Sequence, residues 1–186
     1  MDSRTKILNA ASQLFLKGGV AALSVRAISK TAGLSTIGIY SHFQGKQGIL
    51  DTLYIEGFNL VYEAMNVDTN GNADMDDVMR ACEGYLQVAV ENEAHYRLIF
   101  GESDAAYEPS EEARAAADRA FGKLLSNTDE FLRDTQRSSE RMQVSMDIWA
   151  IMHGYVSISH HARANQKFDW RKMALHAVRL HLEACT

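Results

Sequence analysis

Proline and cysteine are both scarce in this chain of 186 residues, which has one proline, Pro109, and two cysteines, Cys82 and Cys185. Proline breaks helices from within because it lacks the backbone donor, so its scarcity favours long helices. The two cysteines lie far apart in the sequence, each in apolar surroundings. We expect both to stay as thiols in a reducing compartment and to be structural and inert.

Long apolar runs are also missing. No stretch approaches the roughly eighteen consecutive apolar residues that a membrane span needs, and the amino-terminal sequence MDSRTKILNAAS turns polar too soon for a secretory signal peptide. The apolar share of 46% and the charged share of 23% are ordinary for a globular protein. These features predict a cytoplasmic protein with no membrane partner, of one large domain or of a small and a medium one.

Positive charge is scarce overall, because the formal net charge is −5, but it is concentrated at one end. Residues 1–50 hold six basic side chains and one acid, a net charge of +5, whereas residues 51–186 carry −10. A basic segment on an acidic remainder is typical of a protein that meets phosphate with one end only.

Helical periodicity dominates the chain, and no alternating strand pattern of useful length appears. A break rich in Asn, Asp and Gly covers 67–76, and a second predicted loop covers 101–110. The sequence therefore predicts an all-α fold. The expected helices cover 3–17, 24–33, 36–42, 46–66, 74–91, 93–100, 109–134, 138–163 and 168–184.

Residues 24–43, SVRAISKTAGLSTIGIYSHF, have the pattern of a helix-turn-helix. Ser24 and Ser35 are good N-caps for two short helices, and Gly33 can adopt the left-handed conformation that a tight turn between them needs. A small core would fix the angle between the helices. We expect Val25, Ile28, Leu34, Ile39 and Phe43 to form it, with Ala27 and Ala32 permitting close approach.

The outward residues of the second short helix are unusual for a buried helix but suit one that enters the major groove. Thr36 can meet base edges or phosphate, Ile37 can touch a thymine methyl, and Gly38 lets the backbone come close to DNA. Tyr40, His42 and Lys46 are expected on phosphates. The full set of predicted DNA-binding residues is Ser24, Arg26, Ser35, Thr36, Ile37, Gly38, Tyr40, Ser41, His42 and Lys46.

The segment GLSTIGIYSHFQGKQGIL resembles the recognition helix and following turn of the TetR family of transcriptional regulators. The matching positions are Gly33, Leu34, Ser35, Ile39, Tyr40, His42, Phe43 and Lys46. The resemblance covers about residues 5–55 and departs from the family pattern at Ile37 and Gly38, in mid-helix, which affects base preference rather than fold. It implies a three-helix helix-turn-helix DNA-binding domain over 1–45, followed by a larger helical domain over 46–186.

The later segments NEAHYRLIFG (92–101) and IWAIMHGYVSI (148–158) are similar to a TetR subgroup with a Trp-His-Gly carboxy-terminal domain, here Trp149, His153 and Gly154. The resemblance implies that this domain binds a small-molecule effector and forms a homodimer through the last two long helices. Two recognition helices would then meet successive major grooves of a near-palindromic operator on double-stranded DNA. The expected mode is repression relieved by the effector, with activation left open.

Bulky side chains on helices of the 46–186 domain are the candidate effector contacts, although such residues are more often ordinary core. They are Tyr62, Tyr85, Phe100, Phe121, Trp149, Met152 and His153. An effector binding there would favour one relative orientation of the two DNA-binding domains. The helix over 46–66 would carry the signal, since it belongs to both domains.

Other functions have weaker support in the sequence. Asp68, Asn70 and Asn72 have the spacing of a calcium loop, but Ala73 stands where the loop needs glycine and Met79 where it needs glutamate.

The histidines His95, His153, His160 and His161 invite a metal-responsive reading, yet adjacent helical histidines diverge by about 100° and no ligand spacing repeats. We therefore expect no cofactor and no metal. The sequence also lacks a nucleophile elbow, a phosphate loop and a His-Glu-x-x-His helix, so we expect no enzyme. A metal-responsive regulator, or a ligand-binding or adaptor protein without specific DNA binding, stays open as an alternative.

Overall fold

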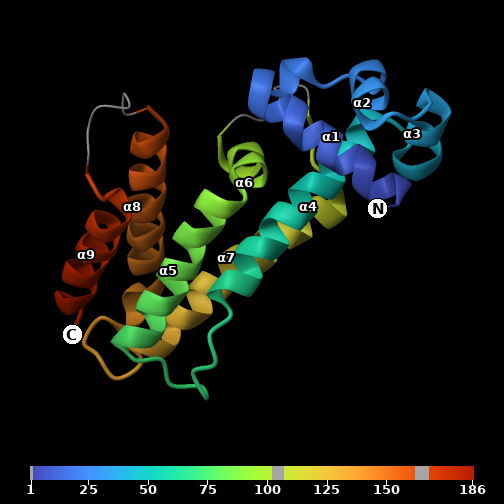
Figure 1. Cartoon of the computed structure of the whole chain (residues 1–186). Helices are drawn as coiled ribbons and strands as arrows, with labels where there is room; N and C mark the ends of the chain where they lie inside the picture. Colours follow the sequence, from blue (N-terminus) through green and yellow to red (C-terminus); the bar gives the residue numbers. More distant parts are fainter. Residues whose placement is uncertain (1, 102–106, 162–167) are drawn as a thin grey trace. The chain divides into compact units, whose positions relative to one another are not determined.

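The computed structural model describes residues 2–101, 107–161 and 168–186, and within these ranges all regular structure is helical (Figure 1). In chain order the helices are α1 (Ser3–Gly18), the 3₁₀ turn η1 (Val20–Ala22), α2 (Val25–Ala32), α3 (Thr36–Phe43), α4 (Lys46–Met65), α5 (Met75–Glu91), α6 (Glu93–Phe100), α7 (Glu111–Leu132), the 3₁₀ turn η2 (Ser138–Glu140), α8 (Arg141–His161) and α9 (Trp170–Glu183).

The predicted all-α fold is confirmed, and the helix ends agree with the expected ranges to within a few residues. The predicted helix over 138–163 is divided by the structure into η2 and α8. Its last two residues, and 102–106 of the predicted loop, lie outside the described residues, as does the side chain of His161.

The chain packs as two compact units. Unit 1 consists of Met1–Leu60 and Glu91–Asp118, and unit 2 consists of Val61–Val90 and Arg119–Thr186. The long helices α4 and α7 each contribute to both units. The expected functional boundary at residue 45 stays a prediction, because this division groups residues by packing alone.

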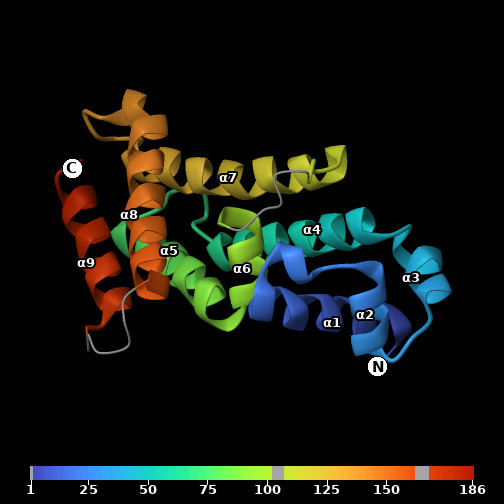
Figure 2. The same ribbon diagram turned by 90° about the horizontal axis from the view of Figure 1, so that it is seen from above.

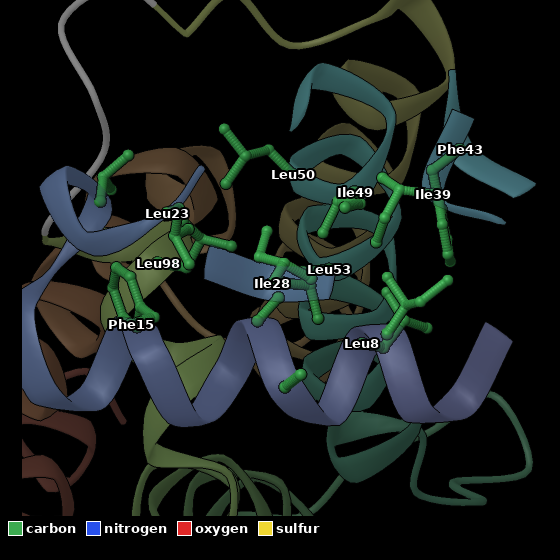
Figure 3. Packing of buried hydrophobic residues seen from close by; sticks show 14 of the residues in the cluster. Leu8, Phe15, Leu23, Ile28, Ile39, Phe43, Ile49, Leu50, Leu53 and Leu98 are labelled. Atoms are coloured by element: carbon green, nitrogen blue, oxygen red, sulfur yellow. The ribbon is translucent and has the colours of Figure 1, made fainter. Parts of the chain in front are cut away.

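The core of unit 1 gathers side chains from α1, α2, α3, α4 and α6 (Figure 3). Ile7, Ile28, Ile39 and Ile49 have no exposed surface, and Leu98 of α6 joins them although it lies far along the chain. Each buried aliphatic side chain contributes about 1.5–3 kcal/mol relative to exposure, so this cluster holds the short helices together.

Unit 2 is held together by contacts between segments that lie far apart in the sequence. The buried Asn127 of α7 donates its amide to the carbonyl of Met65 at 3.0 Å. Gly84 of α5 packs directly against the backbone of α4, since a Cβ there would lie 2.3 Å from the Ala64 carbonyl oxygen. Helices α8 and α9 lie side by side in both views (Figures 1 and 2).

The two cysteines are free and buried, Cys82 in α5 and Cys185 just after α9. Burial raises the pKa of the Cys82 thiol to about 12, which suppresses the reactive thiolate. Burial also raises the pKa of Cys185, against the opposing effect of Arg137. Both observations support inert, structural thiols.

Candidate nucleic-acid interface

The helix pair α2 and α3 is capped as the sequence predicts. The Ser24 hydroxyl accepts a hydrogen bond from the amide of Ala27 at 3.1 Å, and the Ser35 hydroxyl accepts one from the amide of Gly38 at 3.2 Å. Gly33 ends α2 in the left-handed region, with φ of 67°. Each serine cap stabilises its helix by about 1 kcal/mol, so these eight-residue helices are defined by local chemistry as well as by packing.

The inner side of α3 is anchored by Ile39 and Phe43, whose side chains are 0% and 5% exposed. Ile28 of α2 is fully buried beside them, while Val25 and Leu34 are half-buried at the edge of the cluster. The five-residue core predicted for the helix-turn-helix is therefore present, and Figure 3 shows Ile28, Ile39 and Phe43 of it.

The outer side of α3 is open to solvent. We call it the reading face, and it consists of Thr36, Ile37, Gly38, Tyr40, Ser41 and His42, of which Gly38 is half-buried and the others are exposed. Ile37 is 78% exposed and Tyr40 is 58% exposed, both unusual for large apolar side chains. Ser41 turns its hydroxyl onto the carbonyl of Gly38 at 3.0 Å, so part of its hydrogen-bonding capacity is already used.

The predicted residues outside α3 have different surroundings. Ser24, Arg26 and Ser35 are exposed, and the Arg26 guanidinium has no ion-pair partner among the described residues. Lys46 is half-buried, and its ammonium donates to the Val20 carbonyl at 3.5 Å. Contact of Lys46 with phosphate would therefore require it to share or leave this backbone partner.

Gly38 in the reading face and Gly48 at the start of α4 have opposite surroundings. A Cβ added to Gly38 would have only the Ser35 hydroxyl near it, at 3.8 Å, so the packing of the chain does not require glycine there. A Cβ on Gly48, at the start of α4, would lie 1.9 Å from the Phe43 carbonyl oxygen. Gly48 is thus required for α4 to follow α3 closely, whereas Gly38 leaves space for something outside the chain.

Three hydrogen bonds that the sequence did not predict join α4 to residues 107–110. The carboxylate of Asp51 accepts hydrogen bonds from the Tyr107 hydroxyl at 2.9 Å and from the Ser110 amide at 3.0 Å. Gln47 donates to the Glu108 carbonyl at 2.7 Å. Burial, followed by the bond to Asp51, raises the pKa of Tyr107, so the phenol stays a neutral donor. No local pattern marks contacts across more than fifty residues.

The predicted effector residues fall into three groups. Phe121, Trp149 and His153 lie together in unit 2, with ring centroids 6.0 Å apart for the first pair and 6.2 Å for the second. Burial lowers the pKa of His153. Tyr85 and Met152 are almost fully buried in unit 2, and Tyr62 of α4 is half-buried.

Phe100 belongs to unit 1, where its ring contacts Phe58 and Tyr96 at centroid distances of 5.6 and 5.0 Å.

Two cavities with described linings contain none of these seven residues. A groove of about 550 Å³ in unit 2 is lined by Asp76, Met79, Arg80, Glu83, Leu175, His176 and Arg179. A second hollow, in unit 1 between α1 and α6, is too small for a water molecule. The effector site stays a prediction. Across the described ranges, no cluster of metal-ligating side chains occurs, and no helix is both long and apolar enough to span a membrane.

Comparison with known families identifies both parts of the chain. Residues 7–53 match the family model described as bacterial regulatory proteins of the tetR family. Residues 78–180, more than half of the chain, match the model described as the tetracyclin repressor-like carboxy-terminal domain. The first match includes the whole of α2 and α3.

Curated relatives and solved structures agree with this. The chain is 25% identical over 124 residues to the HTH-type transcriptional regulators Rv1816 of Mycobacterium tuberculosis and Mb1846 of Mycobacterium bovis. The match covers 64% of this chain and 53% of each relative, so the chain spans about half the length of these relatives.

Among solved structures, a tetR-family regulatory protein from Rhodococcus RHA1 is 20% identical with a TM-score of 0.77, covering 100% of this chain and 97% of that one. PfmR of Thermus thermophilus, a TetR family transcriptional regulator, is 20% identical with a TM-score of 0.71, covering 95% and 97%. A SmeT–triclosan complex is 18% identical with a TM-score of 0.69, covering 98% and 90%. At these identities the structures show the shared fold.

Proposed function

The chain belongs to the TetR family of DNA-binding transcriptional regulators, and from that premise we propose that it is a dimeric repressor which a small-molecule effector releases from its operator. It would act in the cytoplasm, where the DNA lies. The observation that carries the DNA-binding part is the reading face, which is exposed on a short helix whose other side is fully packed.

The chemistry of the reading face supports contact with a major groove. Thr36 and Ile37 stand in the first turn of α3, where recognition helices meet base edges. Tyr40 and His42, farther along α3, would contact phosphates. Gly38 has free space at its Cα, which permits close approach of the DNA backbone. Arg26 would add a contact from α2, and the N-cap residues Ser24 and Ser35 would add contacts from the starts of α2 and α3.

Dimerisation through α8 and α9 is supported by large apolar side chains that the chain leaves uncovered. We call this set the apolar face, and it consists of Met142, Met146 and Ile158 on α8 and Met173 and Leu180 on α9, each between 39% and 54% exposed. Met142 and Met146 lie one turn apart on α8, and Met173 and Leu180 lie two turns apart on α9, so each pair shares one side of its helix. Exposed apolar side chains that share a surface mark protein interfaces, and methionine is enriched there. A second copy burying the same residues would form a four-helix bundle.

Effector control is supported by family membership and by the aromatic group in unit 2. The SmeT neighbour, which shares this fold, is a complex with triclosan. In the present chain, Phe121, Trp149 and His153 offer rings and one polar group, the combination typical of small-molecule sites. Because α4 contributes to both units and follows α3 directly in the chain, it is the element through which a ligand would act on DNA binding.

The test is a selection of bound sequences from random DNA duplexes, followed by titration of the full chain against the selected duplex and a scrambled one. We expect a near-palindromic consensus and an affinity at least about 10³-fold above the scrambled duplex at physiological salt. Affinity for both should fall steeply as salt rises.

Gln13→Ala, at an exposed site on α1, is the control variant and should leave both affinities unchanged. Failure to enrich any sequence would overturn the regulator and favour a ligand-binding or adaptor role.

A further inference from the structure

Glu56 on α4 lies between side chains from two other helices of unit 1. Its Oε1 atom is 3.9 Å from Nη1 of Arg4 on α1, and its Oε2 atom is 3.5 Å from Nε2 of His95 on α6. Neither approach is a complete hydrogen bond, and the His95 Nε2 is buried without any hydrogen-bond partner. One carboxylate is therefore shared by two partners and fully engaged by neither.

Arg4 connects this carboxylate to the end of α3. Its guanidinium carbon lies 5.2 Å from the centre of the Phe43 ring, the distance of a cation–π contact. Phe43 is the last residue of α3, and its ring is part of the unit 1 core (Figure 3). If Arg4 is fixed in place, its contact with Phe43 helps to fix the carboxy-terminal end of α3.

His95 connects the same carboxylate to α6. The next residue on α4, Gly57, packs closely against α6, because a Cβ there would lie 2.9 Å from Cγ2 of Ile99 and 3.4 Å from the Cβ of His95. With so little slack, any displacement of α6 along α4 changes the distance from His95 to Glu56. The unpartnered nitrogen favours such a change, since a buried polar atom without a hydrogen bond destabilises the fold.

We propose that Glu56 is a positioning residue that sets the order of α3 through Arg4, and that His95 competes with Arg4 for its carboxylate. When His95 completes its bond to Glu56, Arg4 loses its anchor and the end of α3 loosens. When Arg4 holds the carboxylate, α3 is firm. The link to DNA affinity rests on the proposed function, but the competition itself is a property of the free protein.

Hydrogen exchange of the free full-length chain tests the competition without any DNA, so its failure is distinct from failure to bind an operator. Glu56→Gln keeps the size of the side chain and removes its charge. We expect amides of 36–43 to exchange about three- to fivefold faster, the effect of losing one exposed cation–π contact. The control is Glu63→Gln, at an exposed position two turns farther along α4, which should leave α3 unchanged.

Variants of the two partners complete the test. Arg4→Ala should accelerate α3 exchange as much as Glu56→Gln, and the double variant should add nothing further, because both act on one contact. Arg4→Lys, which keeps the charge, should restore most of the protection. His95→Leu should slow exchange of α3, since Glu56 is then left to Arg4 alone. Unchanged α3 exchange in Glu56→Gln, additive effects in the double variant, or faster exchange in His95→Leu would each overturn the proposal.

Discussion

The reading face of α3 and the apolar face of α8 and α9 both expose large side chains, but their chemistry differs. On α3 the exposed Ile37 is surrounded by hydroxyls, an imidazole and a phenol. On α8 and α9 the exposed residues are methionine, isoleucine and leucine. The first surface can satisfy a polar, charged partner, whereas the second can only be satisfied by another apolar surface. Exposure alone does not identify a partner, but the neighbouring side chains do.

Charge divides the chain in the same sense. The first fifty residues, which hold α3, carry +5, and the remainder, which holds α8 and α9, carries −10. A polyanion is attracted to the first segment and repelled by the second. Substitutions in the apolar face should therefore affect dimerisation, and substitutions in the reading face should affect DNA binding without changing the dimer.

The largest expected effect comes from charging the apolar face. Met146→Glu combined with Leu180→Glu would place two unpaired carboxylates in the proposed dimer interface, which costs several kcal/mol. We expect a monomer by sedimentation equilibrium and a loss of operator affinity of about 100-fold or more, since one monomer reaches only a half-site.

Gln136→Glu, at an exposed position outside both faces, adds a charge of the same kind and should remain a dimer with normal affinity. If the double variant were still a dimer, the apolar face would not be the dimer interface.

The next prediction distinguishes the effect of a substitution in α3 on stability from its effect on DNA binding. Gly38→Ala fits the free space at that position, so we expect unchanged or slightly raised thermal stability, because alanine favours a helix over glycine by about 1 kcal/mol. Operator affinity should fall about tenfold as the added methyl blocks close approach of the DNA.

Gly48→Ala is the opposite case. It should lower the melting temperature markedly, because its methyl would overlap the Phe43 carbonyl. If Gly38→Ala bound the operator normally, the reading face would not meet DNA at this point.

A smaller effect is expected at Tyr40. Tyr40→Phe removes one hydroxyl from the reading face, and the loss of a phosphate hydrogen bond should weaken operator and random DNA alike by about fivefold. Thr36→Ala should instead change the preferred base at one position of a selected consensus. The control is Tyr155→Phe on α8, which removes the same hydroxyl group far along the chain from α3 and should leave both DNA affinities unchanged. A change of sequence preference in Tyr40→Phe would show that this phenol reads a base.

The smallest effect concerns pH and unit 2. Burial lowers the pKa of His153, so below its ordinary value near 6.5 the unfolded chain binds more protons than the folded one. The stability that the neutral His153 contributes is therefore present above pH about 6.5 and is lost as the pH falls. Urea unfolding at pH 7 and pH 5 should show a smaller loss in His153→Gln than in the parent chain. Equal losses would contradict this.

Local patterns were enough to predict the helices and the reading face. Period, caps and the turn glycine are encoded within a few residues, as Ser24, Gly33 and Ser35 show.

Contacts between distant segments were not predictable in the same way. Leu98 joins the core of unit 1, and Tyr107 bonds Asp51 across 56 residues, because tertiary packing brings α6 and the start of α7 onto α4. Gly48 had a visible signal, a glycine inside a predicted helix, but only the structure shows that it faces the Phe43 carbonyl. The effector residues were chosen by type, which does not distinguish core from pocket.

A hydroxyl-radical footprint of the chain on its selected DNA tests directly whether a dimer contacts DNA through the outward side of α3. If two copies each place α3 in a major groove, protection should appear as two patches related by a two-fold axis, with centres about 10 base pairs or a multiple apart on one face of the duplex. A single protected patch, or two patches with no symmetry between them, would contradict a dimer that reads DNA through the outward side of α3.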